Sequence, residues 1–138
     1  MSRQTDLTAK PAIQVAVMVL EDGNGRVLLT QRAKEKHLGG FWEFPGGKVE
    51  AGETPSDALA RECQEELHYS PSSPQHILTI EHDYENFSVQ LVVFHERNLK
   101  AQVTPAEQQP MQWVPINKLS NIQLPAANTA IVHHLTKT

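Results

Sequence analysis

The sequence contains very little cysteine and no long hydrophobic run. Cys63 is the only cysteine among 138 residues, which excludes an intramolecular disulfide and a zinc site built from cysteines. No apolar run approaches the roughly 20 residues that a transmembrane helix needs. Residues 1–10 are polar and lack the apolar core of a signal peptide. We therefore expect a soluble, cytoplasmic protein that does not insert into a membrane.

Positive charge is also scarce. Lys and Arg number 12 against 16 Asp and Glu, so the formal net charge is −4 and the pI is about 5.9. Proteins that bind duplex DNA or RNA normally present a basic face, so this balance argues against a nucleic-acid partner. An acidic protein can still handle a small nucleotide if its carboxylates hold a cation. We expect a small-molecule partner and a monomer or dimer.

The length and composition are those of one globular domain. Domains most often have about 100–150 residues, and 39% hydrophobic with 20% charged residues is ordinary for a soluble protein. There is no internal repeat, low-complexity segment or linker. We expect a single domain over residues 1–138, with residues 1–11 as a loose N-terminal tail that ends at Pro11.

Hydrophobic patterning predicts several strands. The Val-rich run Ile13–Leu20 is almost continuously apolar, which favours a strand buried on both faces. A turn at residues 21–25 connects it to a second strand at residues 26–31, so that the two form a hairpin. Three further strands are expected at residues 76–82, 88–96 and 111–116. Residues 42–44 are a short extended piece, and Pro45-Gly46-Gly47 predicts a turn.

Two helices complete the predicted fold. The clearer one runs from Thr54 to Leu67, with Thr54 as N-cap, Pro55 at the first helical position and Asp57 three residues after the cap. Pro125 opens a final helix that runs to about Leu135. Strands with two helices predict an α/β (α+β) fold with a mixed β-sheet and helices on its faces.

The first of these helices carries a row of carboxylates. Glu62, Glu65 and Glu66 have i, i+3, i+4 spacing and share one helix face. Three like charges repel one another unless a cation lies between them, and Mg²⁺ prefers carboxylate and phosphate oxygens. Taken alone, such a row is more often a solvated helix face, with Arg61 as a simple i, i+4 partner of Glu65. The adjacent apolar stripe is formed by Leu59, Cys63 and Leu67.

The surrounding residues resemble a known motif. Gly47–Tyr69 matches the Nudix box, G-x5-E-x7-R-E-U-x-E-E-x-G-U with U a bulky apolar residue, because Gly47, Glu53, Arg61, Glu62, Glu65 and Glu66 are all in register. His68 replaces the last glycine of the box, which puts the C-terminal cap of the helix in question rather than the carboxylates. The resemblance implies a Nudix-type α/β/α sandwich with a mixed sheet.

The resemblance also implies a metal site and roles for its residues. In the Nudix family the box binds Mg²⁺ or Mn²⁺. The implied metal ligands are Glu62, Glu65, Glu66 and the backbone carbonyl of Gly47. Glu53 and Arg61 would hold the helix and its carboxylates in place. Glu107 corresponds to a glutamate outside the box that reaches the metal and acts as a base.

Outside the box, the chain resembles the Nudix enzymes that hydrolyse oxidised purine nucleotides. The stretch Trp42–Glu50 matches their approach to the box, and Phe44 within it is a candidate substrate contact. Arg32 and His37 correspond to residues that bind the nucleotide, and Asn128 corresponds to the residue that reads the oxidised guanine. On residue type alone, Arg32 is equally a surface charge. Glu107 is more often a solvent-facing loop residue, and Asn128 is more often a capping or exposed residue.

We therefore predict metal-dependent hydrolysis of 8-oxo-dGTP to 8-oxo-dGMP and pyrophosphate, which would keep oxidised bases out of DNA. Two alternatives remain open at this stage. The first is a Nudix pyrophosphatase for another nucleotide, such as a modified pyrimidine triphosphate, which the stretch Phe41–Phe44 also resembles. The second is a binding module that reads oxoguanine without catalysis. Such modules lose the glutamate cluster, whereas this chain keeps it.

Overall fold

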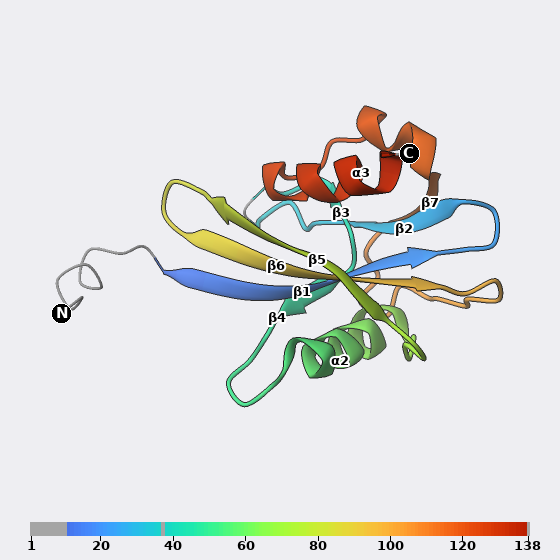
Figure 1. Ribbon diagram of the computed structural model, residues 1–138, viewed down its shortest axis with the longest axis horizontal. Coiled ribbons are helices and arrows are strands. Elements are labelled where there is room, and N and C mark those ends of the chain that lie inside the picture. The colour runs from blue at the N-terminus through green and yellow to red at the C-terminus, as the bar shows by residue number, and fades with distance from the viewer. Residues whose placement is uncertain (1–10, 37, 138) are drawn as a thin grey trace, which may run out of the picture.

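A mixed β-sheet lies between two helical layers (Figure 1). The computed structural model describes residues 11–36 and 38–137. Helix α2 (Pro55–Leu67) covers one face of the sheet, and helix α3 (Thr129–Thr136) covers the other. This arrangement confirms the predicted α/β/α sandwich. Residues 1–10, which include most of the expected tail, and His37 lie outside the described residues.

The strands pair in the order β3-β2-β1-β6-β5, with β4 on β1 and β7 on β2. Two short 3₁₀ helices, η1 and η2, precede α3. The bounds are β1 (Ala12–Glu21), β2 (Arg26–Gln31), β3 (Trp42–Glu43), β4 (Gly46–Lys48), β5 (Gln75–Asp83), β6 (Ser88–Arg97), β7 (Met111–Pro115), η1 (Ile116–Asn121) and η2 (Ala126–Asn128). Among the described helices, none is long and apolar enough to cross a membrane.

Strand β1 is the centre of the sheet. It runs parallel to β6 along its whole length, from the pair Ala12↔Ser88 to the pair Glu21↔Arg97. The predicted hairpin with β2 forms, but the register pairs only Glu21 with Val27. Burial on both faces is correct for residues 16–20 and wrong for residues 13–15, which are only partly covered or exposed. The reason is that the helices cover only the second half of the strand.

The predicted turn at residues 45–47 is only partly correct. The chain bends at Pro45, and Gly46 and Gly47 then enter strand β4, which pairs antiparallel with β1. Gly46 has a φ of 150°, and a Cβ there would overlap the carbonyl oxygen of Ala16. Glycine therefore allows the backbone of β4 to lie directly against β1.

Helix α2 begins and ends where the sequence predicts. The hydroxyl of Thr54 accepts a hydrogen bond from the N–H of Asp57 at 3.1 Å, and the Asp57 carboxylate accepts one from the N–H of Thr54 at 3.2 Å. At the other end His68 takes the left-handed conformation, with φ 53° and ψ 38°. A histidine thus adopts the backbone that glycine favours, at a cost of about 1–2 kcal/mol.

The predicted C-terminal helix starts later than expected. Residues 126–128 form the 3₁₀ helix η2, and the α-helical part begins only at Thr129. Pro125 fixes the entry into this segment, and the N–H of Asn128 donates to the carbonyl of Pro125 at 2.8 Å. Asn128 therefore lies at the N-cap of α3 rather than inside it.

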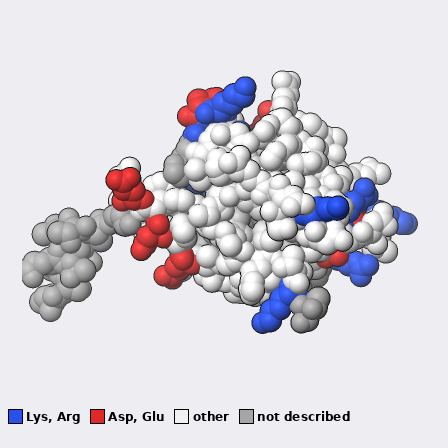
Figure 2. Space-filling view, turned by 90° about the horizontal axis from the view of Figure 1, so that it is seen from above, with Lys and Arg blue, Asp and Glu red and all other residues white. Residues whose placement is uncertain are grey.

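Charged side chains are unevenly distributed over the surface. Figure 2 shows the molecule from the side of α3, with carboxylates gathered near the end from which the N-terminal trace leaves. Lys and Arg side chains lie mainly toward the opposite end, and the centre of the view is largely uncharged.

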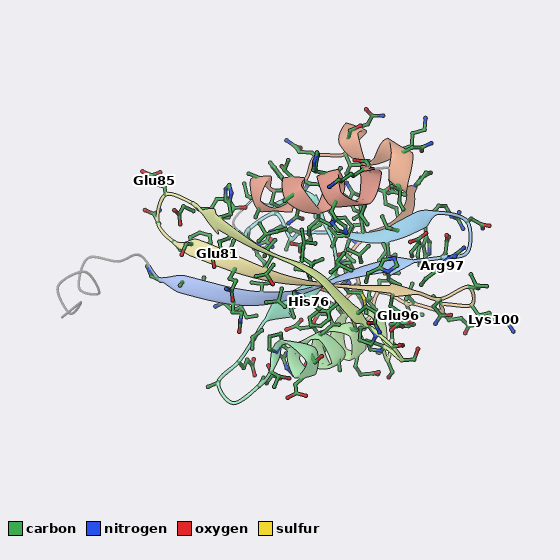
Figure 3. The ribbon with its side chains drawn as sticks, viewed as in Figure 1. His76, Glu81, Glu85, Glu96, Arg97 and Lys100 are labelled. Atoms are coloured by element: carbon green, nitrogen blue, oxygen red, sulfur yellow. The ribbon has the colours of Figure 1, made fainter. Side chains whose placement is uncertain are left out.

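Strands β5 and β6 form a long antiparallel hairpin whose two ends differ. Glu85 marks its tip, and Glu81 lies further along β5, whereas His76 and Glu96 lie toward the opposite end of the sheet (Figure 3). The register runs from Asp83↔Ser88 near the tip to Gln75↔His95, with an irregularity between His76 and Leu78.

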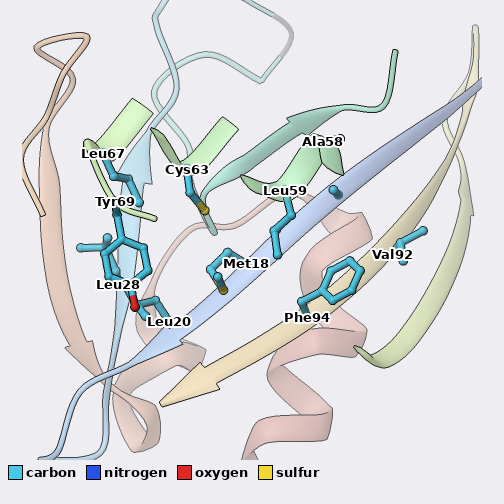
Figure 4. Packing of buried hydrophobic residues seen from close by; sticks show 11 residues of the cluster. Met18, Leu20, Leu28, Ala58, Leu59, Cys63, Leu67, Tyr69, Val92 and Phe94 are labelled. Carbon is cyan, nitrogen blue, oxygen red and sulfur yellow. The ribbon is translucent and has the colours of Figure 1, made fainter. Parts of the chain in front are cut away.

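The core consists of two clusters, one on each face of β1. Ala16, Met18 and Leu20 face α2, whereas Val17 and Val19 face α3. The predicted apolar stripe of α2 is fully buried, and Leu59 and Cys63 point toward Met18 (Figure 4). Burial raises the pKa of the Cys63 thiol to about 12, so this cysteine serves as a packing residue.

The packing of α2 gives a stability prediction. Leu59→Ala removes a fully buried side chain, and we expect it to lower the free energy of unfolding by about 2–5 kcal/mol. Leu99→Ala makes the same chemical change at a side chain that is 69% exposed, and we expect a loss below about 1 kcal/mol. Urea unfolding of both variants checks this. Equal losses would contradict the docking of α2 through Leu59.

Candidate active site

Arg61 is the centre of a network of carboxylates at the start of α2. Its Nε atom lies 2.7 Å from Oε2 of Glu53, and its Nη1 atom lies 2.9 Å from Oε2 of Glu62. The i, i+4 contact with Glu65 is longer, at 3.4 Å. Arg61 is therefore more than a simple helix-surface partner of Glu65. It joins the loop before the helix to the carboxylate face.

Glu53 is held on both sides. One of its oxygens accepts hydrogen bonds from the backbone N–H of Glu50 at 2.9 Å and from Nη2 of Arg61 at 3.0 Å. The Arg61 guanidinium and this backbone N–H lower the pKa of Glu53 to about 2. Arg61 also donates to the carbonyl of Lys48 at 3.0 Å. The loop between β4 and α2 is therefore tied to the helix through two side chains.

Gly47 and Glu62 approach each other closely. A Cβ at Gly47 would overlap the carboxylate of Glu62, so that only glycine leaves this carboxylate in its place. Partial burial raises the pKa of Glu62, with Arg61 acting in the opposite direction. The negative charges of Glu65 and Glu107 raise it further. The backbone of β4 and the helix face thus meet at this point.

Glu66 is the most perturbed carboxylate in the site. Its Oε1 atom is buried and has no hydrogen-bond partner. Burial raises its pKa to about 8, and the charges of Glu43, Glu62 and Glu107 add to the rise, whereas the backbone N–H of Gly46 opposes it. These influences bring together carboxylates from β3, α2 and the loop before β7. A buried carboxylate oxygen without a donor is a place where a cation fits.

The loop before β7 is fastened to the C-terminal end of α2. The N–H groups of Thr104 and Ala106 donate to the carbonyls of Leu67 and Glu66, both at 3.0 Å. The side chain of Gln109 donates to the Glu66 carbonyl at 3.2 Å, and its own amide oxygen is buried without a partner. Glu107 is exposed on this loop, close enough to raise the pKa values of Glu62 and Glu66.

Arg32 and Glu43 form a pair that connects the site to the sheet. Nη1 of Arg32, just after β2, lies 2.8 Å from Oε1 of Glu43 on β3, and both side chains are about a quarter exposed. Burial raises the pKa of Glu43, while Arg32 opposes the rise. Sequence reasoning missed Glu43 and Gln109. Glu43 could have been found from its place in the sequence. Because side chains alternate along a strand, Glu43 faces away from its neighbours Trp42 and Phe44.

Phe44 and Asn128 lie on the other side of the sheet. Phe44 is 4% exposed and belongs to the cluster that packs under α3, and Asn128 is 7% exposed. The side-chain oxygen of Asn128 is buried and has no partner. The segment from β3 to β4 passes from these residues to the carboxylates of α2. His37, the other predicted nucleotide contact, lies outside the described residues.

The carboxylates have the right donor chemistry for a metal but are not preassembled around one point. Among residues 11–36 and 38–137, no three acidic, histidine or cysteine side chains already form a group that could hold a metal ion. Repulsion between the carboxylates and the ion pairs of Arg61 with Glu53 and Glu62 account for this. The hard oxygen donors, the unpaired Glu66 oxygen and the close backbone at Gly47 fit Mg²⁺ or Mn²⁺.

Comparison with known proteins adds independent support. A family model for the NUDIX domain matches residues 16–134. An 8-oxo-dGTP diphosphatase of Escherichia coli is 30% identical over 125 residues, which cover 91% of this chain and 97% of that relative. A CTP pyrophosphohydrolase of Escherichia coli is 30% identical over 101 residues, which cover 73% of this chain and 74% of that relative.

A solved structure agrees with the fold. The structure reported for MutT of Aliivibrio salmonicida and Vibrio cholerae has a TM-score of 0.73 and 28% sequence identity. The match covers 91% of this chain and 97% of that one. The family match and these relatives define a hydrolase that acts on nucleoside triphosphates. The chain belongs to the Nudix family, which confirms the resemblance seen in the sequence.

The raised pKa of Glu66 gives a prediction for the metal-free protein. The folded state keeps the Glu66 proton up to a pKa of about 8, whereas the unfolded state releases it near 4.5. The stability that this proton contributes is therefore complete below about pH 4.5 and is lost as the pH rises through 8. Relative to the wild type, Glu66→Gln should gain stability from pH 5 to pH 8, on the order of a few kcal/mol.

Urea unfolding in EDTA at several pH values measures this gain. Glu65→Gln is the matched control, because the Glu65 side chain lies on the same helix and is 54% exposed. We expect the stability of this variant to depend on pH as that of the wild type does. A constant difference between Glu66→Gln and the wild type across this pH range would contradict the raised pKa of Glu66.

Proposed function

We propose that this protein hydrolyses an oxidised purine nucleoside triphosphate, 8-oxo-dGTP, to 8-oxo-dGMP and pyrophosphate, with Mg²⁺ or Mn²⁺ as cofactor. The proposal includes a role in nucleotide-pool sanitation in the cytoplasm. The observation that carries it is a pair of buried oxygens without partners: Glu66 Oε1 on helix α2, and Asn128 Oδ1 at the N-cap of helix α3. One needs a cation and the other needs a hydrogen-bond donor.

The carboxylate face of α2 is the proposed metal site. Glu62, Glu65 and Glu66 supply oxygens from the helix, Gly47 supplies a backbone carbonyl and Glu107 supplies an oxygen from the loop before β7. When bound, the cation would neutralise phosphate charge and lower the pKa of a water molecule. Glu53 and Arg61 are positioning residues, because Arg61 holds Glu53 and Glu62 through contacts of 2.7 and 2.9 Å.

The chemical step needs a proton acceptor. We assign this role to Glu107, which is exposed and carries a negative charge felt by both Glu62 and Glu66. The water oxygen forms a bond to the β phosphorus, and the bond from that phosphorus to the oxygen bridging to the α phosphorus breaks. The bridging oxygen leaves with the monophosphate, and the carboxylate takes the water's proton.

Arg32 is the proposed phosphate contact. Its ion pair with Glu43, at 2.8 Å, holds the guanidinium beside the carboxylates that surround Glu66. A guanidinium carries a permanent charge and a fixed fork of donors, which suits a phosphate group. His37 is proposed as a further nucleotide contact from the resemblance alone.

Asn128 and Phe44 are proposed to bind the base. The unpaired oxygen of Asn128 accepts a hydrogen bond, and the amide nitrogen donates one. A purine oxidised at position 8 carries a hydrogen on N7 and a carbonyl at O6, so that its edge matches both groups. Phe44 supplies a buried aromatic ring in the same core cluster as Ala127, the neighbour of Asn128. A normal guanine has a bare N7, which would leave the Asn128 oxygen unpaired.

A pyrimidine triphosphate is the second candidate substrate. The CTP pyrophosphohydrolase of Escherichia coli is 30% identical to this chain, the same identity as the 8-oxo-dGTP diphosphatase. The metal site would serve either substrate equally, because it contacts only phosphates. The two candidates differ in the edge that they offer to Asn128, which is N7–H with O6 on the oxidised guanine and N4–H with N3 on cytosine, so the substrate panel has to distinguish them.

Steady-state hydrolysis of a substrate panel tests the proposal. With Mg²⁺ we expect kcat/KM for 8-oxo-dGTP to exceed that for dGTP about a hundredfold or more, with pyrophosphate released and activity lost in EDTA. The panel includes dCTP, 5-hydroxy-dCTP and ADP-ribose, and the products are identified. A preference for a pyrimidine would keep the metal site and reject the base assignment.

The base assignment gives a separate prediction. Asn128→Ala removes both hydrogen-bonding groups, and we expect the ratio of kcat/KM for 8-oxo-dGTP over dGTP to fall about tenfold or more. Hydrolysis of dGTP itself should change much less. Asn121→Ala, at an exposed residue at the end of η1, is the control and should keep the ratio. An unchanged ratio in Asn128→Ala would exclude this residue from base recognition.

A further inference from the structure

Asn128 depends on contacts outside its own segment for its position. The 3₁₀ helix η2 spans only Ala126–Asn128 and has no side-chain cap at its N-terminus, and Asn128 makes no side-chain cap for α3. Within the segment, Asn128 is held by the hydrogen bond from its N–H to the Pro125 carbonyl at 2.8 Å. Such a short turn does not by itself fix where a side-chain amide lies.

The hydroxyl of Tyr84, in the turn between β5 and β6, supplies such a contact. It accepts a hydrogen bond from the backbone N–H of Ala127, the residue before Asn128, at 3.3 Å. Ala127 is 4% exposed, so its N–H has little access to water. The bond therefore ties η2 to the tip of the β5–β6 hairpin at the residue next to the proposed base reader.

Tyr84 is itself well anchored. Its backbone N–H donates to the carbonyl of Phe87 at 2.8 Å, which closes the hairpin turn. Its ring packs edge-on against His82, with centroids 4.7 Å apart, and lies tilted against Phe87 at 5.1 Å. Tyrosine has few rotatable bonds, so a ring packed on two sides holds its hydroxyl in a fixed place. The hairpin tip is thus a rigid support.

We propose that the Tyr84 hydroxyl is a positioning and specificity-determining group, which sets the place of Asn128 through Ala127 and thereby the preference for the oxidised base. The inference rests on the proposed base-reading role of Asn128. Groups that recognise a ligand must be held within about 0.5 Å of the productive geometry. A segment released from the hairpin tip would let the Asn128 amide drift by more than that.

Tyr84→Phe isolates the hydroxyl, because it keeps the ring and its packing. We expect KM for 8-oxo-dGTP to rise about fivefold and the preference over dGTP to fall by a similar factor, with kcat nearly unchanged. We expect KM to change and kcat to stay because the carboxylate face of α2, where the chemical step is proposed, lies across the sheet from η2. The amide proton of Ala127 should also exchange faster with solvent, and its NMR shift should move, in the absence of substrate.

Tyr69→Phe is the matched control. The Tyr69 hydroxyl donates to Glu96 and accepts from Asn98 at 2.9 Å, near the end of the sheet that lies away from the hairpin tip (Figure 3). We expect this variant to lower stability without changing the preference between substrates. If both variants lose preference for 8-oxo-dGTP over dGTP, the loss reflects general destabilisation and the proposal is overturned.

The two proposals fail in different ways. If the wild type does not prefer 8-oxo-dGTP, the proposed function fails, whereas the Ala127 exchange measurement still tests the contact with Tyr84. If the wild type prefers 8-oxo-dGTP and Tyr84→Phe keeps that preference, the positioning role of Tyr84 is wrong and the function stands. Unchanged exchange at Ala127 would also overturn the positioning role.

Discussion

Repulsion between carboxylates is the constraint on which the site depends. Glu62 and Glu66 lie on α2, Glu43 on β3 and Glu107 on the loop before β7, yet the charges of the other three raise the pKa of Glu66. Arg61 offsets part of this repulsion by pairing with Glu53 and Glu62, and Arg32 does the same for Glu43. The two guanidiniums leave the Glu66 oxygen without a partner. The fold tolerates that cost because the apolar stripe of α2 is fully buried against β1. The packing of α2 against β1 thus keeps these carboxylates close together although their charges repel one another.

The central strand explains how one substrate could meet both halves of the site. Alternate residues of β1 face α2 and α3, so the two cores are separated by one layer of backbone. The segment from Glu43 to Gly47 passes beside that layer, with Glu43 near the carboxylates and Phe44 in the opposite core. A nucleotide bound along this segment would place its phosphates and its base on different sides of the sheet. If Asn128 and Phe44 bind the base as proposed, base preference is set on the side of the sheet away from the carboxylates of α2.

Sequence could predict the features that depend on residues close together in the chain. The N-cap at Thr54, the end of α2 at Leu67 and the shared face of Glu62, Glu65 and Glu66 follow from helical spacing and capping. The parallel pairing of β1 with β6 and the entry of Gly46 into β4 depend on contacts between distant segments. The closeness of Glu43 to Glu66 and the bond from Ala127 to Tyr84 are of the same kind. Periodicity within one segment carries no information about such partners.

His68 links a departure from the family pattern to the site itself. Glycine would take the left-handed backbone at this position without strain, whereas histidine adopts it at some cost. Its ring compensates, because Nδ1 lies 2.9 Å from the hydroxyl of Thr104. The backbone N–H of Thr104 donates to Leu67, and that of Ala106 donates to Glu66. The His68 ring therefore adds, to these backbone hydrogen bonds, one contact between the helix end and the loop that carries Glu107, and glycine could not make it. Replacing glycine with histidine thus gives up an unstrained helix cap and adds a contact to the loop that carries Glu107, the proposed proton acceptor.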